Sequence, residues 1–320
     1  MLVVDLTDPG APDVLQVTSR PTPEPGPDEV LIKVAAAGVN RADLLQRQGV
    51  YPAPEGAPPW PGLEVAGVVV ALGTAVTAWS LGDEVCALLP GGGYAEFVAV
   101  HHELVLPRPS GVGLIDSAAL VESACTVWSN LEAAGAREGQ SILVHGGTGG
   151  IGSVAIQYAV ARGLRVSATA GSPERVKRCL ELGASLAFDY RTEDWSRELA
   201  SEGGVDIVLD IMGAAYLDRN VAALAPGGTL AVIGLQGGRK GELDLSRLMA
   251  RRGHILGTTL RSRPLAERAA IVAGVRKDVW PLVPDAVTPV VARRLPLAEA
   301  AEAHKLLEAG GIEGKVLLLP

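Results

Sequence analysis

Hydrophobic and polar positions follow two different patterns along this chain, and the change falls near residue 117. Before it, short alternating or β-branched runs are separated by Pro and Gly turns, which is typical of strands. The runs predicted as strands are 2–6, 14–18, 29–35, 65–72, 84–89 and 94–100. One helix is predicted in this part, at 40–48. The first part of the chain is therefore expected to be rich in β-structure.

From residue 117 onward, helical and strand patterns alternate. The predicted helices are 117–136, 173–182, 195–201 and 216–224, and the predicted strands are 142–144, 165–169, 184–189, 205–210 and 229–234. This alternation indicates a parallel, doubly wound sheet. It fades after residue 256 into helices at 264–275 and 297–309 and a strand at 314–319. The simplest architecture is α/β, with a nucleotide-binding domain inserted into a β-rich domain that resumes at the C-terminus.

A glycine motif lies between the strand at 142–144 and a helical segment. Gly147-Thr148-Gly149-Gly150-Ile151-Gly152 fits G-x-G-x-x-G. In that context the first glycine allows a tight turn, the second admits a pyrophosphate, and the third lets the helix pack on the strand. Free N–H groups at the helix start would bind the pyrophosphate. A purely structural turn is the alternative, but the flanking elements favour a dinucleotide site.

Composition and charge narrow the class of protein. The 320 residues are 48% hydrophobic and 20% charged, which suits a large core. A net charge of −8 argues against nucleic acid or an anionic membrane as the main partner. The three cysteines are widely scattered, as expected of reduced thiols in a cytoplasmic protein. We also expect no signal peptide and, without an apolar run of ~18 residues, no membrane span.

Several further segments carry a resemblance to a known family. They are AGVNRADLLQRQG at 37–49, PGLEVAG at 61–67, GDEV at 82–85, GVDIVLD at 204–210, RGH at 252–254 and GKV at 314–316. With the glycine motif, they resemble the zinc-free quinone oxidoreductases of the medium-chain dehydrogenase/reductase superfamily. Residues 40–49 with Tyr51, and LRSR at 260–263, resemble the tumour-suppressor-induced branch.

That resemblance implies a domain organisation and a set of partners. A GroES-like, β-rich catalytic domain is expected at 1–120 and 262–320, and a Rossmann NADP-binding domain at 121–261. The implied coenzyme is NADPH, the implied partner is a small-molecule quinone or enone, and the implied assembly is a homodimer.

The end of the second strand of the nucleotide domain bears on the choice of coenzyme. NAD enzymes place an acid there to bind the ribose 2′-hydroxyl, but this strand ends at Gly171 and Ser172. The missing acid favours NADP(H). By resemblance, Arg175 and Tyr190 bind the 2′-phosphate. The alternatives are that Ser172 only caps a helix, that Arg175 is a surface charge, or that Glu174 replaces the acid and favours NAD.

The residues that bind zinc in related alcohol dehydrogenases are not repeated in this chain. By resemblance, Asn40 stands where those enzymes have cysteine, and Leu63 stands where a histidine precedes Glu64. Zinc needs about three Cys, His or acidic ligands, so we expect no metal. Without a Lewis acid, the chemistry favours an acceptor that takes hydride readily, such as a quinone or an enone.

The resemblance also assigns site residues. Asn40, Asp43 and Tyr51 would line the catalytic site. Asn40 would donate to a quinone oxygen, and Tyr51 would stack on the ring or donate its hydroxyl. Asp43 could instead form only an i,i+4 pair with Arg47. Further cofactor contacts are expected at Thr126, Gly171, Ser172, Gly234, Leu235, Thr259, Leu260 and Lys315. Thr126 could instead bond its own helix, and Lys315 could be a satisfied surface lysine.

The sequence thus predicts an NADPH-dependent quinone oxidoreductase that transfers hydride without zinc. One alternative is a zinc-free enoyl or enone reductase, for which Tyr51 is the only obvious proton donor. The other is a non-catalytic NADPH-binding structural protein, because a fold does not determine a function.

Overall fold

Three segments of the chain form two structural units in the computed structural model, which describes residues 1–320. Residues 1–125 and 260–320 make one unit, and residues 126–259 make the other. The first division falls within helix α3 (Val121–Ala133) and the second follows strand β13 (His254–Gly257). The sequence placed these junctions at 120/121 and 261/262.

The two-segment unit is built on a seven-stranded sheet. Its main path is β14-β15-β3-β4-β5-β7, with β6 also paired to β3, and β1 and β2 form a separate antiparallel pair. The strands are β1 (Leu2–Leu6), β2 (Leu15–Ser19), β3 (Glu29–Val39), β4 (Glu64–Leu72), β5 (Glu84–Leu88), β6 (Phe97–His101), β7 (Val105–Pro107), β14 (Val291–Pro296) and β15 (Lys315–Leu319). The helices are α1 (Arg41–Arg47), α2 (Leu114–Ser117), α9 (Leu265–Asp278) and α10 (Ala300–Ala309).

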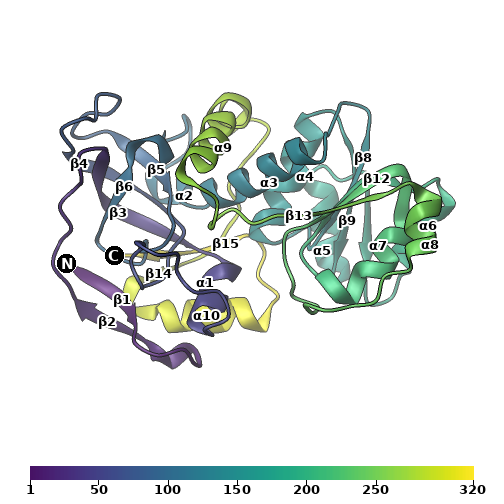
Figure 1. The fold of residues 1–320 in the computed structure, drawn as a ribbon, viewed down its shortest axis with the longest axis horizontal. Helices are drawn as coiled ribbons and strands as arrows, with labels where there is room; N and C mark the ends of the chain where they lie inside the picture. The colour runs from purple at the N-terminus through teal and green to yellow at the C-terminus, as the bar shows by residue number, and fades with distance from the viewer. The chain divides into compact units, whose positions relative to one another are not determined.

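The C-terminal strand completes this sheet. Val316 of β15 pairs with Val39 of β3 in an antiparallel register. One step further along that register brings Lys315 to Asn40, the residue at the start of α1 (Figure 1). The last residues of the chain therefore reach a segment that lies some 275 positions earlier in the sequence.

The other unit is a parallel sheet of six strands in the order β10-β9-β8-β11-β12-β13 (Figure 1). Its strands are β8 (Ser141–His145), β9 (Arg165–Ala170), β10 (Leu186–Asp189), β11 (Val205–Asp210), β12 (Leu224–Val232) and β13. Its helices are α4 (Gly150–Ala161), α5 (Pro173–Glu181), α6 (Trp195–Ser201), α7 (Leu217–Ala223) and α8 (Leu245–Arg251), with the end of α3. In chain order the strands read 3-2-1-4-5-6, the Rossmann order. The expected fold class is confirmed.

The single helix expected at 117–136 is wrong, because the chain is broken there into α2 and α3. The carboxylate of Glu64 accepts a hydrogen bond from the backbone N–H of Glu122 at 2.9 Å. A side chain from β4 thus satisfies an N–H at the start of α3 that a preceding helical turn would otherwise bind.

Elements near the edges of the two sheets were missed by the sequence patterns. They are α8, β13 and β14. Most residues of β13 are exposed, and β14 carries exposed arginines at 293 and 294. Edge strands lack the continuous apolar run that marks a buried parallel strand, so periodicity does not reveal them.

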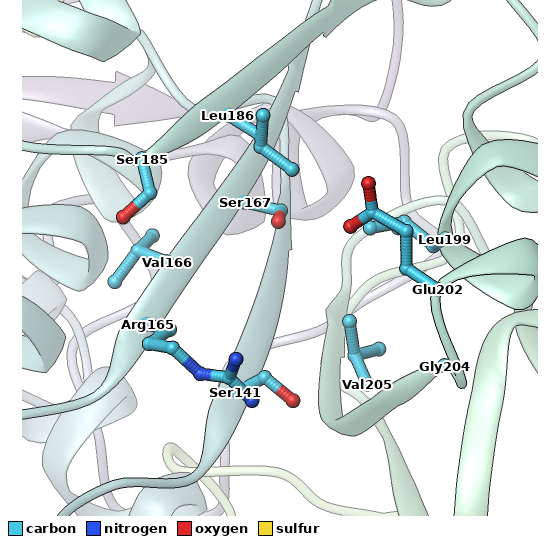
Figure 2. Close-up of a pocket in the computed structure, with 10 residues that line it drawn as sticks. All are labelled: Ser141, Arg165, Val166, Ser167, Ser185, Leu186, Leu199, Glu202, Gly204 and Val205. Atoms are coloured by element: carbon cyan, nitrogen blue, oxygen red, sulfur yellow. The ribbon is translucent and has the colours of Figure 1, made fainter.

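Figure 2 shows a pocket of about 180 Å³ in the parallel-sheet unit. Ser141, Arg165 and Val205 line it, and each begins a strand. The pocket therefore lies toward the amino ends of the parallel strands. Ligands of doubly wound sheets bind at the opposite, carboxyl ends, so this pocket is separate from the glycine motif. No helix of the structure is long and apolar enough to cross a lipid bilayer.

Candidate active site and coenzyme site

The glycine motif forms the turn from β8 to α4, and steric contacts require its glycines. Gly146 has a φ of +67°, which favours glycine. A Cβ on Gly152 would lie 2.2 Å from the carbonyl oxygen of Gly146, and one on Gly147 would lie 2.6 Å from the Sγ of Cys179. The turn is therefore too tight for side chains at these positions. Gly146 precedes the motif as the sequence identified it.

The start of α4 suits an anion. Gly149 is the N-cap, and no side chain hydrogen-bonds to the first N–H groups of the helix. A Cβ on Gly149 would approach only the carbonyl of Gly146, at 3.4 Å, so the space beside it is open. Thr148 is buried and Ile151 is half-buried beside this opening. Unsatisfied N–H groups at a helix start, with backbone that a ligand can approach, fit a pyrophosphate.

The end of β9 presents groups that fit a phosphate. The Oγ of Ser172 accepts from the backbone N–H of Arg175 at 3.4 Å and so caps α5. The half-buried side chain of Arg175 makes no ion pair. A Cβ on Gly171 would lie 2.5 Å from the Oη of Tyr190, so glycine is needed for the tyrosine to sit there. The strand end itself carries no carboxylate.

Glu174 lies in the first turn of α5, beyond the strand end. A hydrogen bond from the Ser172 hydroxyl holds the pKa of its exposed carboxyl below the usual value. The acid that could favour NAD is therefore present as a carboxylate near Ser172, in the helix rather than at the end of the strand.

A histidine that the sequence did not assign a role supports the glycine loop from below. His145 is buried, with Nδ1 3.0 Å from the Oγ1 of Thr169 and Nε2 2.7 Å from the Oδ1 of Asn220. Burial lowers its pKa to about 4, so the ring is neutral. Because the Asn220 oxygen accepts, the ring proton is on Nε2 and Thr169 donates to Nδ1. Thr169 also accepts from Gly146 N–H at 3.4 Å.

The other cofactor residues expected in this unit lie at two places. Gly234 and Leu235 follow the carboxyl end of β12, and Thr259 follows that of β13. These strand ends are at the same edge of the sheet as the glycine loop. Thr126 is in α3, where its carbonyl oxygen accepts from the side chains of Ser129 and Asn130. The structure places Leu260 and Lys315 in the two-segment unit.

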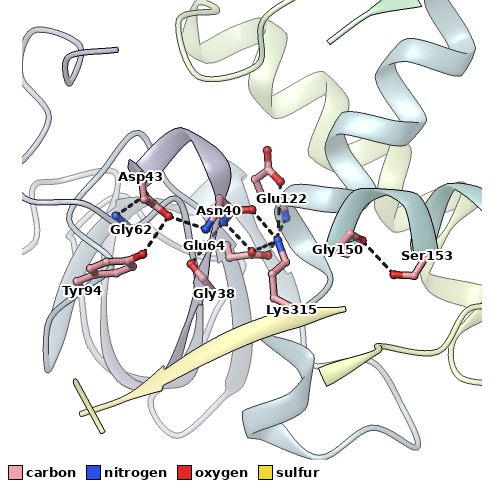
Figure 3. Close-up of polar contacts among 10 residues, drawn as sticks. All are labelled: Gly38, Asn40, Asp43, Gly62, Glu64, Tyr94, Glu122, Gly150, Ser153 and Lys315. Carbon is pink, nitrogen blue, oxygen red and sulfur yellow. Dashed lines mark hydrogen bonds and ion pairs between the residues drawn. The ribbon is translucent and has the colours of Figure 1, made fainter. Parts of the chain in front are cut away.

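A buried ion pair lies at the start of α1 in the two-segment unit (Figure 3). The Nζ of Lys315 is 2.7 Å from the Oε1 of Glu64 and 2.6 Å from the Oδ1 of Asn40. Lys315 is 4% exposed and Glu64 is fully buried. Burial acts to lower the pKa of Lys315, but the charges of Glu64 and Glu122 outweigh it and raise that pKa. The lysine is therefore a fixed cation.

This arrangement occupies both ends of the Asn40 amide. Its oxygen accepts from Lys315, and its Nδ2 donates to Glu64 at 2.9 Å and to the Gly38 carbonyl at 3.4 Å. The donor that the sequence assigned to a quinone oxygen is thus engaged within the protein. The unrecognised members were Glu64 and Glu122. A glutamate inside the apolar segment PGLEVAG was the available signal, because a buried charge needs a partner.

Asp43 is held by backbone donors beside this ion pair. Its Oδ2 accepts from Asn40 N–H at 2.8 Å and from the Tyr94 hydroxyl at 3.2 Å, and its Oδ1 accepts from Gly62 N–H at 2.9 Å. Burial raises the pKa of Asp43 to about 6. The considered pair with Arg47 is not formed, because Arg47 binds Glu308 instead.

Tyr94 extends this network to α10. Its Oη is 3.2 Å from the Nε2 of His304, which is buried. Burial, together with the charge of Arg47, lowers the pKa of His304 to about 3. Tyr94 and His304 thus connect α1 to the C-terminal helix as neutral groups.

Tyr51 differs from Asn40 and Asp43 because its hydroxyl has no hydrogen-bond partner in the structure. The side chain is half-buried. The guanidinium of Arg261 lies over its ring, with Cζ 5.5 Å from the ring centroid. Of the three residues assigned to catalysis, Tyr51 is the one with a free donor.

No three His, Cys, Asp or Glu side chains are grouped so that they could hold a metal ion. Leu63 is a buried apolar residue beside Glu64, and Cys86 is buried with its thiol near the Ser117 carbonyl. The positions compared with zinc ligands thus contain the Lys315–Glu64 ion pair and Asn40.

Comparisons with known proteins give the family. Residues 26–110 match the alcohol dehydrogenase GroES-like domain, and residues 150–273 match the zinc-binding dehydrogenase family. Quinone oxidoreductase of Mus musculus is 34% identical over 97% of this chain and 95% of its own.

Two solved structures match over the whole of both chains. A mycobacterial protein complexed with NADPH is 34% identical with a TM-score of 0.88. An NAD-dependent alcohol dehydrogenase is 32% identical with a TM-score of 0.88. The chain therefore belongs to the quinone oxidoreductases of the medium-chain dehydrogenase/reductase superfamily.

Proposed function

We propose that this chain catalyses the NADPH-dependent reduction of a quinone by hydride transfer, without zinc. The single observation that carries the choice of coenzyme is the end of β9. There Arg175 has no ion pair, Ser172 caps α5, and no carboxylate ends the strand. A guanidinium binds a phosphate through two oxygens, whereas NAD enzymes use an acid at this point.

The glycine loop supports the rest of the coenzyme site. The uncapped start of α4 would hold the pyrophosphate, with Gly147, Thr148, Gly149, Gly150, Ile151 and Gly152 around it. Tyr190 and Arg175 would hold the 2′-phosphate. When bound, NADPH supplies the hydride. Thr126, Gly234, Leu235, Thr259 and Leu260 stay proposed contacts from the resemblance.

The Lys315–Glu64 ion pair supports zinc independence. Lys315 already places a positive charge against Glu64 and Asn40. A divalent cation bound there would face the ammonium without a second acid in contact to offset it, since Glu122 Oε2 is 3.9 Å from Nζ. Lys315 and Asn40 are therefore proposed to position the start of α1 rather than to touch the coenzyme.

Tyr51 supplies what an acceptor needs after hydride arrives. Reduction of a quinone to a hydroquinone consumes one hydride and one proton. The free hydroxyl of the half-buried Tyr51 can donate that proton or a hydrogen bond to the acceptor oxygen.

Steady-state rates test this function. The purified protein is assayed with NADPH and with NADH, against a panel of ortho- and para-quinones and against 2-enoyl thioesters. We expect a higher kcat/KM for quinones and for NADPH, unchanged after metal removal by a chelator. Faster turnover of thioesters would favour the enone reductase, for which the free Tyr51 hydroxyl is also a suitable donor. Coenzyme binding with no turnover of any acceptor would favour the structural protein, and loss of activity with zinc would contradict the proposal.

The edge of the parallel sheet supports a homodimer. Strand β13 is the last in the sheet, and Ile255 on it is 40% exposed; Leu245 and Met249 of α8 are also exposed. An unpaired edge with apolar residues favours pairing with another strand. We infer that two copies pair through β13. Sedimentation of the wild type and of Ile255→Lys tests this, with a monomeric wild type as the contrary result.

A further inference from the structure

Arg261 is a buried cation whose position is determined by three segments of one unit. Its Nε donates to the Pro90 carbonyl at 2.6 Å, its Nη2 to the Oε1 of Gln46 at 2.7 Å, and its Nη1 to the Tyr51 carbonyl at 3.4 Å. The residue is only 6% exposed. Every bond is to a neutral oxygen, so the guanidinium is held firmly but its charge is not neutralised by contact.

The charge of Arg261 therefore acts on its surroundings. Burial lowers the pKa of Arg261, and the carboxylate of Asp43 partly opposes that effect without contacting the guanidinium. Below an effective dielectric constant of water, a charge without a counterion in contact influences neighbouring groups strongly. The ring in contact with it is that of Tyr51.

Tyr51 is arranged to feel this charge at its phenol. The Arg261 Cζ is 5.5 Å from the ring centroid, within the range of a cation–π contact. Burial raises the pKa of Tyr51, the positive charge of Arg261 opposes this, and the negative charge of Glu122 adds to it. Arg261 is thus the cationic group that favours the phenolate form of Tyr51.

We propose that Arg261 is a positioning residue that holds Tyr51 in place and strengthens it as the acid that protonates the reduced acceptor. The proposal rests on the proposed function. After hydride reaches the quinone, the O–H bond of Tyr51 breaks and a new O–H bond forms on the acceptor oxygen. The phenolate left on Tyr51 is stabilised by the guanidinium and then takes a proton from water, which the half-buried side chain can reach. The two electrons come from the hydride, and none come from Tyr51.

Kinetics of matched variants provide the first test. Tyr51→Phe removes the acid, and we expect kcat to fall by roughly 10²-fold or more. Arg261→Met removes the charge with similar bulk and is expected to lower kcat about 10-fold while the dissociation constant for NADPH stays unchanged. The double variant should be no slower than Tyr51→Phe, because Arg261 acts through Tyr51. Independent, multiplying losses in the double variant would overturn the proposal.

A titration separates this proposal from the proposed function. With 3,5-difluorotyrosine placed at position 51, the phenol ionises nearer neutral pH and its absorbance is read without any substrate. Arg261→Met should move this ionisation upward by about one pH unit, and Arg261→Lys should restore most of it. Arg276→Met, which removes an exposed arginine of α9, is the matched control and should leave it unchanged.

The outcomes are distinct. A wild type that turns over no quinone, yet shows the shift, would refute the proposed function and leave the Arg261–Tyr51 coupling standing. Equal ionisation in Arg261→Met and the wild type would refute the coupling. If Arg261→Met does not fold, as circular dichroism would show, Arg261→Lys decides the matter, since retention of the wild-type ionisation in a variant without the planar guanidinium requires the charge to be the cause.

Discussion

The Nζ of Lys315 lies 2.7 Å from the Oε1 of Glu64, and neither side chain is accessible to any significant degree. This pair joins the last strand of the chain, β15, to β4. Asn40 completes it, with its amide oxygen on the ammonium and its amide nitrogen on the carboxylate. A buried charge that loses its partner is costly, so the pair both closes the sheet and fixes the start of α1.

Lys315→Met should therefore destabilise the protein by about 3–5 kcal/mol, because Glu64 would remain buried without a counter-charge. Urea unfolding followed by circular dichroism measures this. The exposed Lys305, paired with Asp13, provides the matched control, and Lys305→Met should have little effect. Adding Glu64→Gln to Lys315→Met should recover part of the loss. A single variant as stable as the wild type would mean that the pair is not a significant interaction.

Acid should destabilise the parallel-sheet unit through His145. Its folded-state pKa is about 4, below the unfolded value near 6.5, so the folded state holds the neutral ring. The stabilising contribution is complete above pH 6.5 and is lost as the pH falls from there toward 4, by roughly 3 kcal/mol in all. The free energy of unfolding of His145→Gln should fall less steeply over this window. His254→Gln, on the exposed strand β13, should keep the wild-type slope, and identical slopes in His145→Gln would contradict the role of His145.

Arg175→Ala should weaken NADPH binding at least tenfold, because a hydrogen-bonded charge pair is worth about 1.5–3 kcal/mol. NADH lacks the 2′-phosphate, so its dissociation constant should change little. Isothermal titration with both coenzymes gives the two values. Lys177→Ala, an exposed neighbour in α5 that pairs with Glu181, is the control. Equal losses for both coenzymes would remove Arg175 from the phosphate site.

Gly152→Ala should disrupt the glycine loop. The added Cβ would lie 2.2 Å from the Gly146 carbonyl, which is backbone and cannot rotate away. We expect a stability loss of about 1–3 kcal/mol and a large rise in the dissociation constant for NADPH. Thermal unfolding and titration measure these. Gly257→Ala, where an added Cβ meets nothing within 4 Å, should change neither, and unimpaired coenzyme binding in Gly152→Ala would show that the loop tolerates a side chain.

Local patterns were sufficient for elements buried on both faces or amphipathic. The helix predicted at 195–201 and the strand at 205–210 match α6 and β11, because their apolar positions recur with the period of the element. Edge strand β13 was missed because solvent on one side removes that pattern. The break between α2 and α3 was missed because a carboxylate 58 positions away, Glu64, caps the second helix.

The sequence by itself determined the Rossmann unit, the glycine turn and the family. These depend on local periodicity and on glycine sterics, which neighbouring residues set. Only the tertiary structure decided what the site residues do. It engaged Asn40 with Lys315 and Glu64, enclosed Asp43 among backbone donors, and left Tyr51 free under Arg261. Electrostatic and hydrogen-bonding partners are chosen by distance in space, and residues 40 and 315 become neighbours only when β15 pairs with β3.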